Sequence, residues 1–112
     1  MNEEKIVVTD EAKLLSALGM GKRAGALTVG VPMICEAMRS GGKNAPKLVF
    51  EASDTSDNTH KRITDKCNFY KTWHVRVECT GEQLAAALGK SASLGAVAVT
   101  DENLSLLVEK YI

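Results

Sequence analysis

Residues Gly21 to Arg39 read GKRAGALTVGVPMICEAMR, which combines a basic pair, a short strand and the start of a helix. Pro32 has a backbone φ fixed near the helical value and no N–H, so it fits the first helical position and places Val31 at the N-cap. Because valine has no side-chain acceptor, the first-turn N–H groups stay available to water, a phosphate or a base edge. Gly30 lets another backbone approach closely. The same residues also fit a water-capped turn without a ligand.

Basic residues gather around this stretch although the chain carries no net charge. Zero net charge argues against coating of nucleic acid through bulk charge, whereas a local patch on a neutral body suits recognition of a shaped anion. A solvated face with ordinary charge scatter explains the pattern equally well. Against the single acid Glu36, this part of the chain has five basic residues, which are Lys22, Arg23, Arg39, Lys43 and Lys47.

Length and composition indicate one globular domain. The 112 residues are 45% hydrophobic and 25% charged, which is ordinary for a chain that buries a single core. No apolar run approaches the roughly 18 residues of a membrane span, and the acidic start MNEEKIVVTDEAK lacks the apolar core of a signal peptide. We therefore expect a cytoplasmic protein with no membrane partner.

The cysteines and histidines show no spacing typical of a metal or catalytic site. Cys35, Cys67 and Cys79 form no Cys-x-x-Cys pair and leave an odd one over, which fits a reducing compartment and small buried or half-buried side chains. Zinc would need about four ligands at close spacing, and His60 and His74 do not supply the pattern. No nucleophile stands near a base, so we expect no metal, no cofactor and no enzymatic activity.

Helical and strand patterns alternate along the chain. Helices are expected over residues 10–25, 32–40, a segment after the turn 53–57 that carries Ile63, Cys67 and Tyr70, residues 80–88, and a last segment capped by Asp101. Strands are expected over 26–29, 47–51, 73–77 and 96–100. Residues 1–9 read as a flexible N-terminus. Five helices and four strands predict an α/β domain over 10–112 with helices on both faces of the sheet.

The small-residue loop from Gly89 to Gly95 is a second candidate binding segment. Its hydroxyls and one lysine fit contacts with a sugar-phosphate backbone, and Leu94 fits contact with an extruded base. A plain connection with Leu94 tucked beneath it fits equally well. The acids between Glu51 and Asp57 do not have calcium-loop spacing, and we interpret this turn as the cap of the following helix.

Three segments together resemble a known family from about Lys13 to Tyr111. They are LLSALGMGKRAGALTVG, PKLVFEASDTSDNTHKRITDKCNFY and EQLAAALGKSASLGAVAVTDENL. The chain resembles the bacterial YlxQ-type ribosomal-protein-like family, within the superfamily of the archaeal ribosomal protein L7Ae and its eukaryotic relative L30e. This resemblance implies a single-domain three-layer α-β-α sandwich with a four-stranded mixed sheet, and RNA binding, typically to kink-turns. It places the RNA on the start of the second helix, the turn before the third helix and the loop before the last strand.

The chain departs from the kink-turn binders at the start of the second helix. Those proteins have Gly-Thr-Asn-Glu followed three residues later by lysine, whereas here the first four positions run from Gly30 to Met33 and Glu36 stands in place of the lysine. Pro32 and Met33 cannot make the polar side-chain contacts, and Glu36 would repel phosphate. The departures argue against a conventional kink-turn mode. They predict that the RNA is bound mainly by Lys22, Arg23, Lys90 and backbone amides.

Residue pattern and resemblance together predict a monomer that binds structured RNA, with ribosomal RNA and translation proteins as candidate partners. A protein-interaction module of the same fold, docking through an apolar patch at Val31, Pro32 and Met33, is the main alternative. A small-ligand site would need a deep pocket with convergent polar groups. The candidate RNA-contacting residues are Lys22, Arg23, Thr28, Gly30, Val31, Pro32, Met33, Arg39, Ser53, Lys90, Ser91, Ala92, Ser93 and Leu94.

Overall fold

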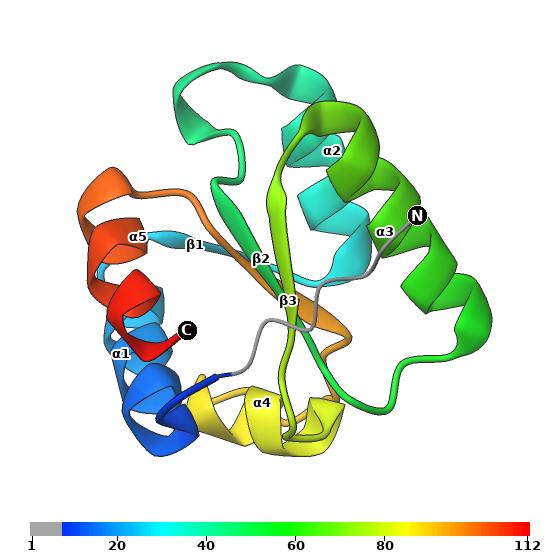
Figure 1. Ribbon diagram of the computed structural model, residues 1–112. Coiled ribbons are helices and arrows are strands. Elements are labelled where there is room, and N and C mark those ends of the chain that lie inside the picture. The colour runs from blue at the N-terminus through cyan, green and yellow to red at the C-terminus, as the bar shows by residue number, and fades with distance from the viewer. Residues whose placement is uncertain (1–7) are drawn as a thin grey trace.

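The computed structural model describes residues 8–112, and within them it contains five α-helices and four strands (Figure 1). The helices are α1 (Glu11–Arg23), α2 (Val31–Ser40), α3 (Asp57–Tyr70), α4 (Gly81–Ala87) and α5 (Glu102–Val108). The strands are β1 (Leu27–Val29), β2 (Leu48–Glu51), β3 (Trp73–Arg76) and β4 (Ala96–Val99). Short 3-10 turns follow α2 and α5, at η1 (Gly42–Asn44) and η2 (Glu109–Tyr111). The predicted number and order of helices and strands are confirmed.

The strands form one mixed sheet in the order β1-β4-β2-β3. Strand β4 runs antiparallel to both of its neighbours, and β2 pairs in parallel with β3. Strands β2 and β4 are fully buried, which follows from their central position. Strands β1 and β3 form the two edges of the sheet.

Helices cover both faces of the sheet, which gives the predicted three layers. Helices α2 and α3 lie together on one face, and α1, α4 and α5 lie on the other (Figure 1). The smaller core, beneath α2 and α3, consists of Ile34, Met38, Val49, Ile63, Cys67, Ala96 and Ala98. The larger core on the opposite face includes Leu14, Leu18, Phe50, Val75, Leu84, Val97 and Val108. None of the helices within residues 8–112 is long and apolar enough to cross a membrane.

Caps fix the helix ends, and several predicted bounds shift by one or two residues. Helix α1 ends at Arg23, because Gly25 already has a left-handed φ of 72°. Side chains of Asp10, Ser56, Thr80 and Asp101 cap α1, α3, α4 and α5, so the predicted cap at Asp101 is confirmed. Each of the four strands is one residue shorter than predicted.

The predicted flexible N-terminus falls mostly outside the described residues, which begin at Val8. Val8 packs against the larger core, and the Thr9 N–H donates a hydrogen bond of 2.7 Å to the carbonyl oxygen of Tyr111. These two residues therefore join the C-terminal turn to the domain.

Candidate nucleic-acid interface

Three connecting segments meet at one end of the sheet. They are the start of α2, the turn between β2 and α3, and the loop between α4 and β4. The Gly30 N–H donates to the carbonyl of Ala96 at 3.0 Å, and the Ala52 N–H donates to the carbonyl of Gly95 at 2.9 Å. These backbone bonds fix the first two segments to the start of β4. The structure thus brings together the three places that the sequence predicts for RNA contact.

The N-terminus of α2 carries no side-chain cap. Its N-cap is Gly30 with a φ of 89°, so the predicted cap at Val31 is wrong and Pro32 occupies the second helical position. Glycine takes this conformation without strain, which lets the chain leave β1 and enter the helix one residue earlier. The predicted lack of a side-chain acceptor is confirmed, so the positive end of a ten-residue helix faces this end of the sheet.

Apolar side chains flank this helix start. Met33 is 60% exposed, while Val31 is half-buried. A Cβ atom at Gly95 would lie 3.2 Å from Cγ2 of Val31, so the loop before β4 lies directly against the first turn of α2. Thr28 lies in the middle of β1, opposite Ala98, on the face that α2 and α3 cover.

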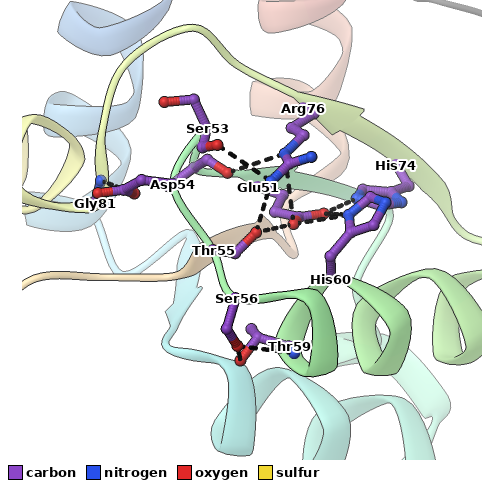
Figure 2. A network of polar contacts seen from close by, with 11 residues as sticks. Glu51, Ser53, Asp54, Thr55, Ser56, Thr59, His60, His74, Arg76 and Gly81 are labelled. Carbon is purple, nitrogen blue, oxygen red and sulfur yellow. Dashed lines mark hydrogen bonds and ion pairs between the residues drawn. The ribbon is translucent and has the colours of Figure 1, made fainter.

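The turn between β2 and α3 is held by its own polar side chains (Figure 2). Ser56 caps α3 by accepting from the Thr59 N–H at 3.2 Å, which confirms the predicted capping role of this turn. Asp54 accepts from the Gly81 N–H at 2.8 Å and so joins the turn to the start of α4. Ser53 is exposed, and its carbonyl oxygen accepts from the Arg76 guanidinium at 3.1 Å.

The loop between α4 and β4 runs from Gly89 to Gly95 and returns toward the start of α4. The Leu94 N–H donates to the carbonyl of Gly81 at 3.0 Å, and the Leu94 side chain packs against the larger core. Of the two interpretations of Leu94, the structure favours the tucked one. The exposed residues of the loop are Gly89, Lys90, Ser91, Ala92 and Ser93.

The basic residues predicted around α2 do not gather at this end of the sheet. Lys22 and Arg23 end α1, close to the Ala26 carbonyl that accepts from the Thr100 N–H beyond the far end of β4. The Lys47 N–H donates to the Val99 carbonyl at the same far end.

Arg39 and Lys43 also lie away from the start of α2. Arg39 is in the last turn of α2, where it forms a bidentate pair with Glu36 at 2.6 and 3.1 Å. The Glu36 carboxylate raises the pKa of Arg39, and Arg39 in turn neutralises the acid that stands where kink-turn binders have lysine. Lys43 lies in η1, beyond the end of α2.

A buried carboxylate behind the β2–α3 turn was not predicted. Glu51 ends β2 with no exposed surface, and three donors surround it (Figure 2). His74 Nε2 lies 2.7 Å from Oε1, His60 Nδ1 lies 2.9 Å from both carboxylate oxygens, and the Thr55 hydroxyl donates to Oε2. The Arg76 Nε atom stands 3.7 Å from Oε2. We call Glu51, His60 and His74 the His–Glu cluster.

The charge of Glu51 is retained despite its burial. Burial alone would raise the pKa of this carboxyl, but hydrogen bonds from His74, Thr55 and His60 outweigh it and hold the pKa at about 2. The sequence contains one signal for this cluster. A glutamate closes the otherwise apolar stretch LVFE, and His74 and Arg76 alternate on the adjacent strand, so both side chains project from the same face.

These features define a small α/β protein in which three connecting segments form a candidate binding surface at one end of the sheet. The chain belongs to the ribosomal protein L7Ae/L30e/S12e/Gadd45 family, whose model matches residues 12–108. Membership confirms the resemblance seen in the sequence and agrees with the expectation of a non-enzymatic protein.

Two curated relatives and two solved structures are similar to this chain. The RNA-binding protein YlxQ of Bacillus subtilis is 36% identical over 88 residues, which cover 79% of this chain and 83% of that protein. The RNA-binding protein YlxQ of Enterococcus faecium is 34% identical over 59 residues, which cover 53% of this chain and 54% of that protein.

The structural matches extend over most of the chain. A protein of unknown function from Bacillus halodurans is 31% identical with a TM-score of 0.77, over 89% of this chain and 96% of that one. The 15.5 kD RNA-binding protein of Giardia lamblia has a TM-score of 0.75 at 17% identity, over 99% of this chain and 93% of that one. At that identity the likeness concerns the fold alone.

Proposed function

We propose that this protein binds structured RNA through the end of the sheet where α2 begins. The observation that carries the proposal is the meeting of an uncapped helix N-terminus with the β2–α3 turn and the α4–β4 loop. Two relatives that are more than 30% identical are named RNA-binding proteins, which supports an RNA ligand over a protein one. Structured RNA presents phosphates and unstacked bases together. A surface that combines free backbone amides with exposed apolar side chains can contact both.

Each segment has a different role in this proposal. The first-turn amides of α2 and the neighbouring Gly30 approach the phosphate backbone, and the exposed Met33 lies against a base or sugar. Ser91, Ala92 and Ser93 contact the sugar-phosphate backbone from the opposite side, with Lys90 as their cation. Because Leu94 is packed against the core, it shapes the loop rather than stacking on a base.

The recognition mode follows from the side chains at the start of α2. Pro32 and Met33 offer no hydrogen bond to a base edge, so we propose that bent RNA is recognised by shape and by backbone contacts. A ribosomal RNA or another RNA of the translation apparatus is the proposed partner class. Lys22 and Arg23 lie at the far end of β1, so they take part only if the RNA extends along that edge.

The experiment is a fluorescence anisotropy titration with a labelled kink-turn RNA and a straightened duplex of the same composition, at 50 and 200 mM salt. We expect preference for the bent RNA. If Lys90, Lys22 and Arg23 each neutralise a phosphate, the affinity falls roughly 40- to 60-fold over this fourfold change in salt. Equal affinity for the two RNAs contradicts recognition of bent RNA, and a salt-independent interaction contradicts phosphate contact.

Two exposed methionines give a matched pair of variants. Met33 is 60% exposed at the proposed interface, and Met20 is 51% exposed in α1, beside α5. We expect Met33→Glu to weaken RNA binding at least about tenfold by placing a carboxylate beside phosphate, and Met20→Glu to have no effect. Equal effects of the two variants contradict the proposed location. The double variant Lys22→Ala/Arg23→Ala reports separately on the β1 edge.

A further inference from the structure

The His–Glu cluster gathers three metal-binding side chains from three different elements. Glu51 ends β2, His60 lies in the first turns of α3, and His74 lies on β3 (Figure 2). One ligand atom from each side chain lies within 4.8 Å of the other two. Figure 2 shows both imidazole rings directed at the same side of the Glu51 carboxylate. The fold therefore creates a ligand set that the sequence spacing does not reveal.

The donor atoms match a borderline divalent cation. Two imidazole nitrogens and one carboxylate oxygen are a common three-residue set for Zn²⁺ sites that keep a position open to water. Metal–ligand bonds of about 2.0–2.2 Å in tetrahedral geometry separate neighbouring ligand atoms by roughly 3.3 Å. The nitrogen–oxygen distances are 2.7 and 2.9 Å, so each has to lengthen by about half an ångström. The three ligand atoms already lie within 4.8 Å of one another, so a modest rearrangement of the two rings admits an ion.

The surroundings of Glu51 resemble the supporting contacts of metal ligands. The Thr55 hydroxyl and the Arg76 guanidinium both lie on the Oε2 side, which leaves Oε1 directed at the two imidazoles. Contacts of this kind orient a ligating carboxylate. The side chains of His60 and His74 are 29% and 17% exposed, so an ion reaches the cluster from solvent although Glu51 is fully buried.

We propose that Glu51, His60 and His74 form a binding site for a single divalent cation of the Zn²⁺ class. In the metal-free protein each ring donates one hydrogen bond to the carboxylate. When the ion binds, each neutral ring carries its proton on the nitrogen that faces away from Glu51, and the nitrogen that faces Glu51 binds the ion. Its remaining coordination positions are filled by water. This inference does not rest on RNA binding. A bound ion would link α3, through His60, to strands β2 and β3, through Glu51 and His74.

Arg76 sets an upper limit on the affinity. Its guanidinium stands 3.7 Å from Oε2 and donates to the Ser53 carbonyl and the Thr55 hydroxyl, so it is held in place beside the site. A fixed positive charge opposes a second one. We therefore expect weaker Zn²⁺ binding than at closed structural sites with four protein ligands.

The test is Zn²⁺ binding to the full chain, reduced and freed of metal, in competition with a chromophoric zinc chelator. We expect one Zn²⁺ per chain. Co²⁺ in place of Zn²⁺ should give visible d–d absorption without the thiolate charge-transfer band that cysteine ligation produces. Because the chain has only two histidines, nitrogen NMR of the imidazoles reports directly on both ligands, and both should shift on addition of Zn²⁺.

The decisive variants are His60→Gln and His74→Gln. The glutamine amide still donates to Glu51, so the fold is kept, but it is a poor zinc ligand. Each variant should weaken Zn²⁺ binding at least about tenfold. The control is Cys35→Ser, which removes a half-exposed thiol, an alternative zinc ligand, and should leave the affinity unchanged. Circular dichroism confirms that each variant is folded.

Two results would overturn the proposal. One is no Zn²⁺ binding by the folded wild-type chain at a roughly tenfold molar excess. The other is binding that survives in both histidine variants or disappears in Cys35→Ser, since either assigns the ion to different side chains. The RNA titration, with and without chelator, is a separate measurement. Failure of the zinc proposal therefore does not decide the RNA proposal, and the reverse also holds.

Discussion

The Gly81 N–H donates a hydrogen bond of 2.8 Å to Oδ1 of Asp54, which links the first residue of α4 to the β2–α3 turn. The Gly81 carbonyl accepts in turn from the Leu94 N–H at 3.0 Å. One glycine thus touches two of the three segments that form the candidate interface. Their relative position depends on one backbone unit and the short side chain of Asp54, and not on a pair of long flexible side chains, which favours a preformed surface.

We expect Asp54→Ala to lower the free energy of unfolding by about 1–3 kcal/mol, because the buried Gly81 N–H loses its acceptor. Asp54→Asn keeps an oxygen at the same place and should recover more than half of this loss. Urea denaturation of the three proteins gives the comparison. If the alanine and asparagine variants lose the same amount, then the charge of Asp54 matters and its hydrogen bond to Gly81 does not.

Two effects of opposite sign act on the stability of a Gly81→Ala variant, namely helix propensity and steric contact. Alanine is favoured over glycine by about 1 kcal/mol in a helix interior, and a smaller preference of the same sign at the first position of α4 predicts a more stable protein. A Cβ atom at this position would stand 2.6 Å from the Leu94 carbonyl oxygen and would also overlap the Ser93 hydroxyl. We expect a net loss of about 2 kcal/mol, together with weaker RNA binding as the loop is displaced.

A second substitution separates the two contacts of the Gly81→Ala variant. Adding Ser93→Gly removes the hydroxyl and leaves the Leu94 carbonyl, so thermal and urea denaturation should show only partial recovery. Full recovery would assign the whole effect to the Ser93 side chain. A Gly81→Ala protein more stable than wild type would contradict the close approach itself.

Most helices and strands follow from local sequence, and the fold was predictable for that reason. Ile63 and Cys67 recur at helical spacing and are buried, and Thr80 and Gln83 form a capping box within four residues. The start of α2 was misplaced by one residue because Pro32 fits either of the first two helical positions. A left-handed Gly30 decides between them, and the dihedral angles of a glycine cannot be read from its identity.

The parts of the site that were not predicted depend on tertiary structure. His60 and His74 stand 9 and 23 residues from Glu51 and meet it only after β2 and β3 pair in parallel and α3 packs above them. Lys22 and Arg23 are close to Gly30 in sequence, but β1 separates them from it in space. Closeness in sequence therefore wrongly grouped Lys22 and Arg23 with Gly30. Distance in sequence hid the contact of the two histidines with Glu51.

The three thiols should differ sharply in reactivity. Burial raises the pKa of Cys67 to about 12 and that of Cys79 to about 11, so both stay protonated at pH 8, whereas Cys35 is half-exposed. We expect iodoacetamide to modify one cysteine in the native protein and all three in urea. Mass spectrometry of peptides identifies the sites. Modification of Cys67 in the native protein at the rate of Cys35 would show that α3 opens readily.

The stability of the metal-free protein should fall at acid pH because of Glu51. Its pKa is about 2 when folded and 4.5 ordinarily, so the folded state favours the charged form. The groups that face this carboxylate are His60 and His74, the Arg76 guanidinium and the Thr55 hydroxyl. Since the folded pKa is the lower one, the stabilisation is complete above about pH 4.5 and is lost as the pH falls toward 2.

The size of this acid effect is about 3 kcal/mol at most, from the difference between the two pKa values of Glu51. The measurement is urea denaturation with a chelator present, at several pH values between 7 and about 3. Glu51→Gln should be less stable at neutral pH, because the surrounding donors lose a charged acceptor, and its stability should fall less steeply toward acid. Parallel curves for the two proteins would mean that other carboxylates govern the acid transition. Convergence of the two curves at low pH would assign the acid transition to Glu51, whose carboxylate holds α3 against the sheet.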